Sequence, residues 1–184
     1  MLDAFSRIGF TVLAPTNERF DPSTVRTEHL LERVRSLTSA LWEYAHTDLP
    51  MVAAGHSEGG WAVLCLAGAQ PWDRAGQPIP VPAEERVTRL VLLAPTLGWF
   101  QAPGALAEVR VPIDVFAGAK DFITPASTAE ILRSAPATVN IHVCQNAGHF
   151  DFMTDLPPGI GPTPGLDHAR FLHELASQID VAVS

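Results

Sequence analysis

The chain has 184 residues, of which 47% are hydrophobic and 17% charged, and these proportions favour one packed globular domain over residues 1–184. The formal net charge of −8, without a long basic run, argues against nucleic-acid binding. No apolar stretch reaches the roughly 18 residues of a membrane-spanning helix. The N-terminus lacks the basic head and cleavage site of a signal peptide, so a cytoplasmic location is expected.

Short apolar runs alternate with helical patterns along the chain. Residues 10–14, "FTVLA", are rich in β-forming side chains and precede Pro15, so they predict a buried strand. Asp21-Pro22-Ser23 is a helix-start signal, and apolar residues then recur at helical spacing from Leu30 to Tyr44. The later expected elements are strands at 49–55, 87–94, 113–117 and 139–143, and helices at 58–69, 125–134 and 168–181.

This alternation predicts the fold class. Continuous apolar strands joined by helical crossovers indicate an α/β fold, with a mostly parallel sheet covered by helices on both faces. The segment after the strand at 87–94 is too short to hold a large cap domain. Ligands of such sheets bind at the carboxyl ends of the strands. Functional residues are therefore expected at that edge.

Three strand ends place chemically useful side chains at this edge. Ser57 follows the strand at 49–55 in "GHSEGG", Asp121 follows the next-but-one strand in "GAKDFITP", and His149 follows the last strand in "NAGHFDF". A serine hydroxyl is a poor nucleophile unless a histidine accepts its proton and a carboxylate fixes the imidazole tautomer. The sequence therefore predicts that Ser57, His149 and Asp121 form a catalytic set.

Glycines surround the serine. A sharp strand-to-helix turn strains the backbone at the nucleophile, and bulky neighbours would clash there. We expect Gly55, Gly59 and Gly60 to provide the necessary space. The serine also lies at the start of a helix, where backbone N–H groups face developing negative charge.

Other polar residues near these motifs have alternative interpretations. Asp151 lies two residues after His149 and competes with Asp121 for the acid role, but the glycine-rich strand end favours Asp121. His56 is interpreted as a packing residue of the turn. The Glu58 side chain is interpreted as a solvated carboxylate at the helix start.

No cofactor or metal site is expected. Cys65 and Cys144 lie in apolar surroundings and are interpreted as reduced core thiols. Trp99 and Phe100 follow the strand at 87–94, where they either line an acyl pocket or form a small apolar lid patch.

The chain resembles the α/β-hydrolase superfamily, and within it the bacterial predicted dienelactone hydrolases and the platelet-activating-factor acetylhydrolases. The resemblance covers nearly the whole chain. It implies a serine hydrolase that acts on a small-molecule carboxylic ester through an acyl-enzyme, with Ser57 as nucleophile, Asp121 as acid and His149 as base. True dienelactone hydrolases use a cysteine nucleophile, so the serine favours ordinary ester hydrolysis, with amide or carbon–carbon cleavage left open. The matching pieces are "GFTVLAPTN", "GHSEGGWAVLCLAGA", "VTRLVLLAP", "VRVPIDVFAGAKDFITP" and "NAGHFDF".

The resemblance also implies an oxyanion hole of two backbone N–H groups. One belongs to Glu58, and the other comes from a loop after an earlier strand, usually marked by His-Gly. The sequence shows neither that strand nor that loop, and residues 1–8 are typical of the helix that follows them, so an N-terminally truncated fold is expected. Losing one donor costs about 10²–10³ in rate. The alternative function is therefore a weakly active or non-catalytic homologue that serves as a binding protein.

The absent strand leads to a geometric expectation. Its place in the superfamily lies between the strands at 10–14 and 49–55. We expect that place to stay empty, with an open slot of roughly 10 Å between the two segments. A continuous hydrogen-bond ladder between residues 10–14 and 51–55 would instead mean that the sheet has closed.

Overall fold

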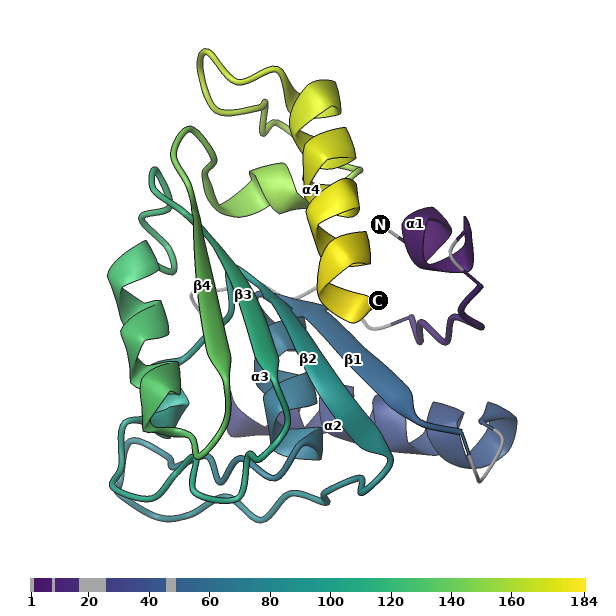
Figure 1. Cartoon of the computed structure of the whole chain (residues 1–184). Coiled ribbons are helices and arrows are strands. Elements are labelled where there is room, and N and C mark those ends of the chain that lie inside the picture. Colours follow the sequence, from purple (N-terminus) through teal and green to yellow (C-terminus); the bar gives the residue numbers. More distant parts are fainter. Residues whose placement is uncertain (1, 8, 17–25, 46–48) are drawn as a thin grey trace.

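The structure, a computed structural model, describes residues 2–7, 9–16, 26–45 and 49–184. Strands and helices alternate along the described chain, as Figure 1 shows. In chain order the elements are α1 (Leu2–Arg7), α2 (Thr27–Tyr44), β1 (Met51–His56), α3 (Glu58–Leu66), β2 (Val87–Leu93), η2 (Gly98–Phe100), β3 (Ile113–Gly118), η3 (Ala126–Ser134), β4 (Val139–Cys144), η4 (His149–Phe152) and α4 (His168–Val183).

The four strands form one parallel sheet in the order β1-β2-β3-β4. Each expected strand from residue 49 onward is present, with ends within two residues of the prediction. The predicted helix at 125–134 is a 3₁₀ helix, and the one at 58–69 ends earlier, at Leu66. The helix-start signal at 21–23 lies outside the described residues. The α/β prediction with a parallel sheet is confirmed.

Both faces of the sheet are covered, because side chains alternate along the buried strands. On β2, Leu90 and Leu92 pack with α2 and α3, whereas Val91 and Leu93 pack with α4 on the other side. Figure 1 shows α2 and α3 behind the sheet and α4 in front of it. None of the described helices is long and apolar enough to span a membrane.

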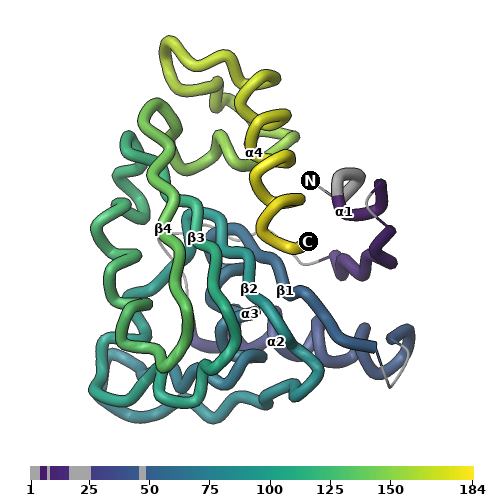
Figure 2. The backbone as a smooth tube through the Cα atoms, viewed as in Figure 1, coloured from purple at the N-terminus to yellow at the C-terminus, as the bar shows by residue number. Residues whose placement is uncertain are grey.

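The segment at 10–14 does not form the predicted strand. Its apolar side chains are used for packing instead: Phe10 and Val12 lie against the cluster that α4 covers. Phe10 also makes an edge-to-face contact with Phe5 of α1, with ring centroids 5.9 Å apart. Figure 2 shows α1 beside the C-terminal end of α4. Residues 10–14 thus pack against the apolar cluster on the sheet without joining the sheet. Side chains can be buried in this way without main-chain hydrogen bonds to a neighbouring strand.

The outer edge of β1 has no partner strand within the described part of the chain. No ladder joins residues 10–14 to β1, so the sheet has not closed in the way that direct pairing would require. A cavity of about 470 Å³ lies there, lined by residues 10–13 on one side and by Val52, Ala54 and Gly55 on the other. The ladder that would have contradicted the open slot is therefore absent among the described residues, although residues 10–14 are not a strand. The slot width of about 10 Å stays a prediction.

The core makes a first prediction. Leu90 is fully buried in the middle of the sheet, whereas Leu49 is 58% exposed. We expect Leu90→Ala to lower the free energy of unfolding by about 2–5 kcal/mol, and Leu49→Ala to change it by less than about 0.5 kcal/mol. Urea titrations followed by circular dichroism measure both values. Equal losses in the two variants would contradict this packing.

The open edge of β1 makes a second prediction. An unpaired strand edge is a template for association, and a lysine on it discourages edge-to-edge pairing. Ala54 is exposed on β1 and lines the cavity beside this edge. We expect Ala54→Lys to slow aggregation at concentrations where the wild type scatters light. Thr88→Lys, at an exposed site of the interior strand β2, is the matched control and should not slow it. Identical scattering from Ala54→Lys and the wild type would argue against an accessible edge.

Candidate active site

Ser57, Asp121 and His149 lie together at the carboxyl edge of the sheet. Ser57 follows β1, Asp121 follows β3, and His149 is the first residue of η4 after β4. Because all strands run parallel, their carboxyl ends meet at one edge, and side chains up to 92 positions apart in the sequence come into contact.

The turn between β1 and α3 holds Ser57 in a strained conformation. Its φ of 54° and ψ of −115° lie in a region that L-residues rarely occupy, at a typical cost of about 1–3 kcal/mol. A Cβ on Gly55 would collide with the backbone carbonyl of Gly59, and one on Gly60 would lie 2.8 Å from the Pro95 side chain. Gly59 itself has open space around its Cβ position, so the expectation that it provides room is wrong.

The three side chains form a hydrogen-bonded series. The Nε2 atom of His149 lies 3.0 Å from the Ser57 Oγ atom. The Nδ1 atom of His149 lies 2.8 Å from the Asp121 Oδ2 atom. A carboxylate accepts hydrogen bonds, so Nδ1 carries the proton and Nε2 is left to accept from the serine. The expected contacts are therefore present, with the tautomer that a general base requires.

The Asp121 carboxylate is fully buried and fully hydrogen-bonded. Its Oδ1 atom accepts from the backbone N–H groups of Ile123 and Thr124, each at 2.8 Å. Its Oδ2 atom accepts from His149 and from the Thr124 hydroxyl at 2.7 Å. Burial raises the pKa of Asp121, but the hydrogen bonds from His149 and Thr124 outweigh it and hold the pKa below its ordinary value. Asp121 is therefore a carboxylate at neutral pH.

Thr124 is a site residue that the sequence analysis missed. Its hydroxyl lies 2.7 Å from Asp121 Oδ2, 3.0 Å from His149 Nδ1 and 3.1 Å from the carbonyl oxygen of Ala94. It thus bridges the acid, the histidine and the end of β2. The signal was the spacing in "DFIT", where a threonine three residues after an aspartate turns back onto it.

Asp151 supports the loop that carries His149. In the described part of the chain, its carboxylate accepts hydrogen bonds from Gly148 and Thr163 and none from the His149 ring. Its Oδ2 atom accepts from the backbone N–H of Gly148 at 2.7 Å and from the hydroxyl of Thr163. Its Oδ1 atom accepts from the Thr163 N–H at 3.1 Å. The choice of Asp121 over Asp151 as the partner of His149 agrees with these contacts.

His56 contacts the histidine loop from the other side. Its Nε2 atom lies 2.9 Å from the carbonyl oxygen of His149. The two imidazole rings are 4.8 Å apart at their centroids. Burial, together with the neighbouring His149, lowers the pKa of His56 to about 4, so His56 is neutral at physiological pH. His56 therefore packs in the turn, as the sequence suggested, and also forms a hydrogen bond with the backbone of His149.

The Glu58 side chain is paired with a cation. Arg33 of α2 lies 2.8 Å from its Oε2 atom, and both side chains are about four-fifths buried. The interpretation of Glu58 as a solvated carboxylate is therefore wrong, because α2 packs against the first turn of α3. Its backbone N–H belongs to the first residue of that helix, where donors have no partner within the helix.

The aromatic pair after β2 is part of the core. Phe100 is almost completely buried and stacks on Trp61 of α3, with ring centroids 6.3 Å apart. Trp99 meets Trp61 edge to face at 6.5 Å. Phe100 therefore lines no acyl pocket. The exposed aromatic side chain near the site is Phe122, which follows Asp121 and is 89% exposed.

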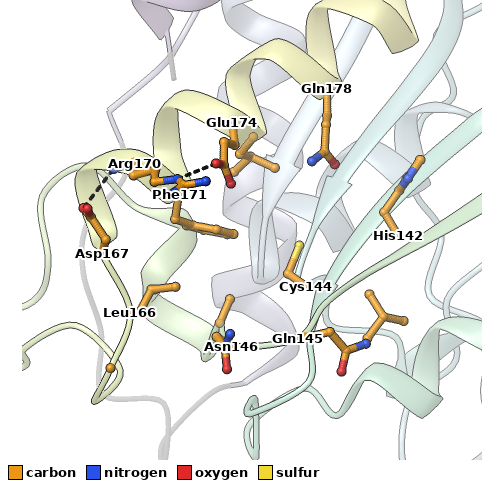
Figure 3. A pocket seen from close by; sticks show the side chains of 14 residues that line it. His142, Cys144, Gln145, Asn146, Leu166, Asp167, Arg170, Phe171, Glu174 and Gln178 are labelled. Carbon is orange, nitrogen blue, oxygen red and sulfur yellow. Dashed lines mark hydrogen bonds and ion pairs between the residues drawn. The ribbon is translucent and has the colours of Figure 1, made fainter.

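Ser57 lines neither of two cavities in the described structure, although its neighbour His56 lines one of them. One is the space beside β1, and the other, of about 550 Å³, lies between β4 and α4 (Figure 3). The charged residues of the second are paired: Arg170 donates to Glu174 at 2.7 Å, and its backbone N–H donates to Asp167. Burial raises the pKa of Cys144, which lines it, to about 11, so this thiol is protonated at neutral pH.

The described residues contain no cluster of potential metal ligands. Over residues 2–7, 9–16, 26–45 and 49–184, no three His, Cys, Asp or Glu side chains are placed to hold an ion.

Comparison with known proteins identifies solved structures of the same fold. No family model and no curated protein matches the sequence. An α/β serine hydrolase homologue from Coxiella burnetii is 18% identical, with a TM-score of 0.58 over 99% of this chain and 73% of that one. A protein of unknown function from Agrobacterium tumefaciens, described as a candidate α/β-hydrolase, is 14% identical, with a TM-score of 0.61 over 99% and 74%. A carboxylesterase from Bacillus cereus is 21% identical, with a TM-score of 0.51 over 90% and 68%.

These similarities extend across nearly the whole chain, and they agree with the parallel sheet and its two helical layers. The chain therefore has the α/β-hydrolase fold.

Proposed function

We propose that the protein is a serine hydrolase that cleaves carboxylic esters of small molecules through an acyl-enzyme, without a cofactor. The observation that carries this proposal is the unbroken series from Ser57 Oγ through His149 to Asp121, with hydrogen bonds of 3.0 and 2.8 Å. The B. cereus carboxylesterase of the same fold supports the choice of an ester substrate.

The chemistry follows from the positions of the protons. Ser57 Oγ attacks the ester carbonyl carbon while its proton passes to His149 Nε2. The resulting imidazolium is stabilised by Asp121 and then gives the proton to the leaving alcohol, so an acyl-Ser57 remains. In the second half of the reaction, His149 Nε2 takes a proton from water, which attacks the acyl carbonyl carbon. His149 then returns the proton to Ser57 Oγ, so the carboxylic acid is released and the serine is restored.

The surroundings of the acid favour this role. The Asp121 carboxylate accepts four hydrogen bonds and is held below its ordinary pKa, so it stays ionised when the imidazolium forms. The Thr124 hydroxyl holds the carboxylate close to the end of β2, where it also lies 3.1 Å from the Ala94 carbonyl oxygen. The acid is therefore preorganised, and no reorganisation is needed during the reaction.

The Glu58 N–H is the proposed oxyanion donor. It lies at the first residue of α3, directly after the nucleophile, where the helix dipole also favours negative charge. The Arg33–Glu58 ion pair joins this helix start to α2, so the donor has a fixed position relative to Ser57.

A second candidate is a binding protein that has lost turnover. The observation in its favour is the outer edge of β1, which has no partner strand in the described part of the chain, so the strand whose loop supplies a second oxyanion donor is not found there. A fluorophosphonate probe separates the two functions. An activated Ser57 becomes labelled, whereas a serine that only has a structural role does not.

Removal of the nucleophile gives the third prediction. We expect Ser57→Ala to abolish both fluorophosphonate labelling and most hydrolysis of p-nitrophenyl acetate, because the variant lacks the hydroxyl that forms the acyl-enzyme. Ser127→Ala removes an exposed hydroxyl on η3 and should keep both activities. Labelling and esterase assays of the purified variants measure the effect. Unchanged turnover in Ser57→Ala would show that the turn is structural.

Replacement of the acid gives the fourth prediction. Asp121→Asn keeps the shape but favours the wrong imidazole tautomer, so we expect kcat to fall by on the order of 10⁴. Asp155→Asn alters an exposed carboxylate four residues after Asp151 and serves as the control with near wild-type kcat. Steady-state kinetics on p-nitrophenyl acetate tests both variants. A loss below tenfold in Asp121→Asn would remove Asp121 from the proposed mechanism.

A further inference from the structure

We propose that His56 is a positioning residue for His149: it donates its Nε2–H to the His149 carbonyl oxygen and thereby fixes the backbone that carries the catalytic base. This inference rests on the proposed function of His149. It assigns a role to the residue before the nucleophile, which neither bonds to Ser57 nor belongs to the Ser57–His149–Asp121 series.

The direction of the hydrogen bond follows from its partners. A carbonyl oxygen only accepts, so at 2.9 Å the proton must lie on His56 Nε2. Neutral His56 can meet this requirement in a single tautomer, with Nδ1 unprotonated. The ring is also packed between His149, at a centroid distance of 4.8 Å, and Phe152, at 6.4 Å. The donor therefore has little freedom to turn away.

The His149 backbone is held on both sides. On its N-terminal side, Asp151 accepts from the Gly148 N–H at 2.7 Å. On its C-terminal side, His56 donates to the His149 carbonyl. The His56 contact fixes the peptide plane that directly follows the Cα atom of His149, and the Asp151 contact holds the peptide between Ala147 and Gly148, one residue before His149. Together they restrict the direction in which the imidazole leaves the backbone.

The contact also links two parts of the mechanism that are far apart in the sequence. His56 is the last residue of β1 and precedes Ser57 directly, whereas His149 lies 93 residues later. Strand β1 therefore positions the nucleophile and its base together. A displacement of the base by about 1 Å can cost on the order of 10²-fold in rate, so this link has a measurable effect on kcat.

Three substitutions separate the donor from the ring. His56→Gln keeps an N–H donor near the Nε2 position but loses the ring, His56→Phe keeps a ring but loses the donor, and His56→Leu loses both. We expect kcat for p-nitrophenyl acetate to fall on the order of 10- to 100-fold in the Phe and Leu variants, with KM nearly unchanged, and to be largely kept in the Gln variant. His142→Phe is the control, because the contacts of His142 are with Phe116, on which it stacks, and with Asp114 at 3.4 Å, both outside the Ser57–His149–Asp121 series.

The order of activities decides the outcome. If the Gln variant exceeds both others, the donated hydrogen bond is what matters. If the Phe variant keeps wild-type kcat, or if the Gln variant falls as far as the Leu variant, His56 acts only by packing and the inference is wrong. Should the Phe variant not fold, the comparison of Gln with Leu alone gives the same decision.

A measurement without substrate separates this inference from the proposed function. The low-field proton resonance of His149 Nδ1–H, in its hydrogen bond to Asp121, is observed by NMR in protein labelled with ¹⁵N-histidine. We expect it to shift or broaden in His56→Phe and to persist in His56→Gln and His142→Phe. If the wild-type protein has no esterase activity, the proposed function is rejected, whereas the positioning role of His56 is still tested by the resonance. An unchanged resonance in both His56→Phe and His56→Leu would reject the positioning role.

Discussion

The close approach of the first turn of α3 to the end of β1 is the constraint on which the site depends. The space of a Gly55 side chain is taken by the Gly59 carbonyl, and Gly60 lies against Pro95. This close approach accompanies a sharp turn in which Ser57 has a positive φ, between the end of β1 and the start of α3. Trp61 and its neighbours hold α3 in place by burial in the core, so apolar packing offsets the local strain.

The elements that the sequence predicts well are those in which one physical signal dominates. The strand at 87–94 is apolar from Leu90 onward, and the strand at 113–117 is apolar except for Asp114. Such runs are typical of strands that are buried on both faces of a parallel sheet. Their carboxyl ends meet at one edge, so the proximity of Ser57, Asp121 and His149 follows from topology before any side-chain geometry is known. Residues 10–14 do not pair with β1, which agrees with the expected open slot, but the prediction that they form a strand is wrong.

The misjudged residues are those whose partners lie far away in the sequence. A strand needs a neighbour to pair with, and no local pattern states whether residues 10–14 have one. Glu58 looks solvated until α2 brings Arg33 against it. His56 has a packing role in the local pattern, and only the fold brings the His149 carbonyl to its Nε2 atom. For Gly59 the motif suggested a crowded position, but the fold leaves open space where its side chain would lie.

The separation of 92 residues between Ser57 and His149 has a consequence for how the site comes into existence. Parallel strands joined by crossovers make mostly non-local contacts, which form slowly because long loops must close first. During synthesis, the turn that holds Ser57 emerges well before Asp121 and His149, and β4 must dock before η4 can bring His149 to Ser57. The proposed hydrolytic activity would thus be a property of the finished sheet alone, because a partly synthesised chain holds Ser57 without His149 beside it.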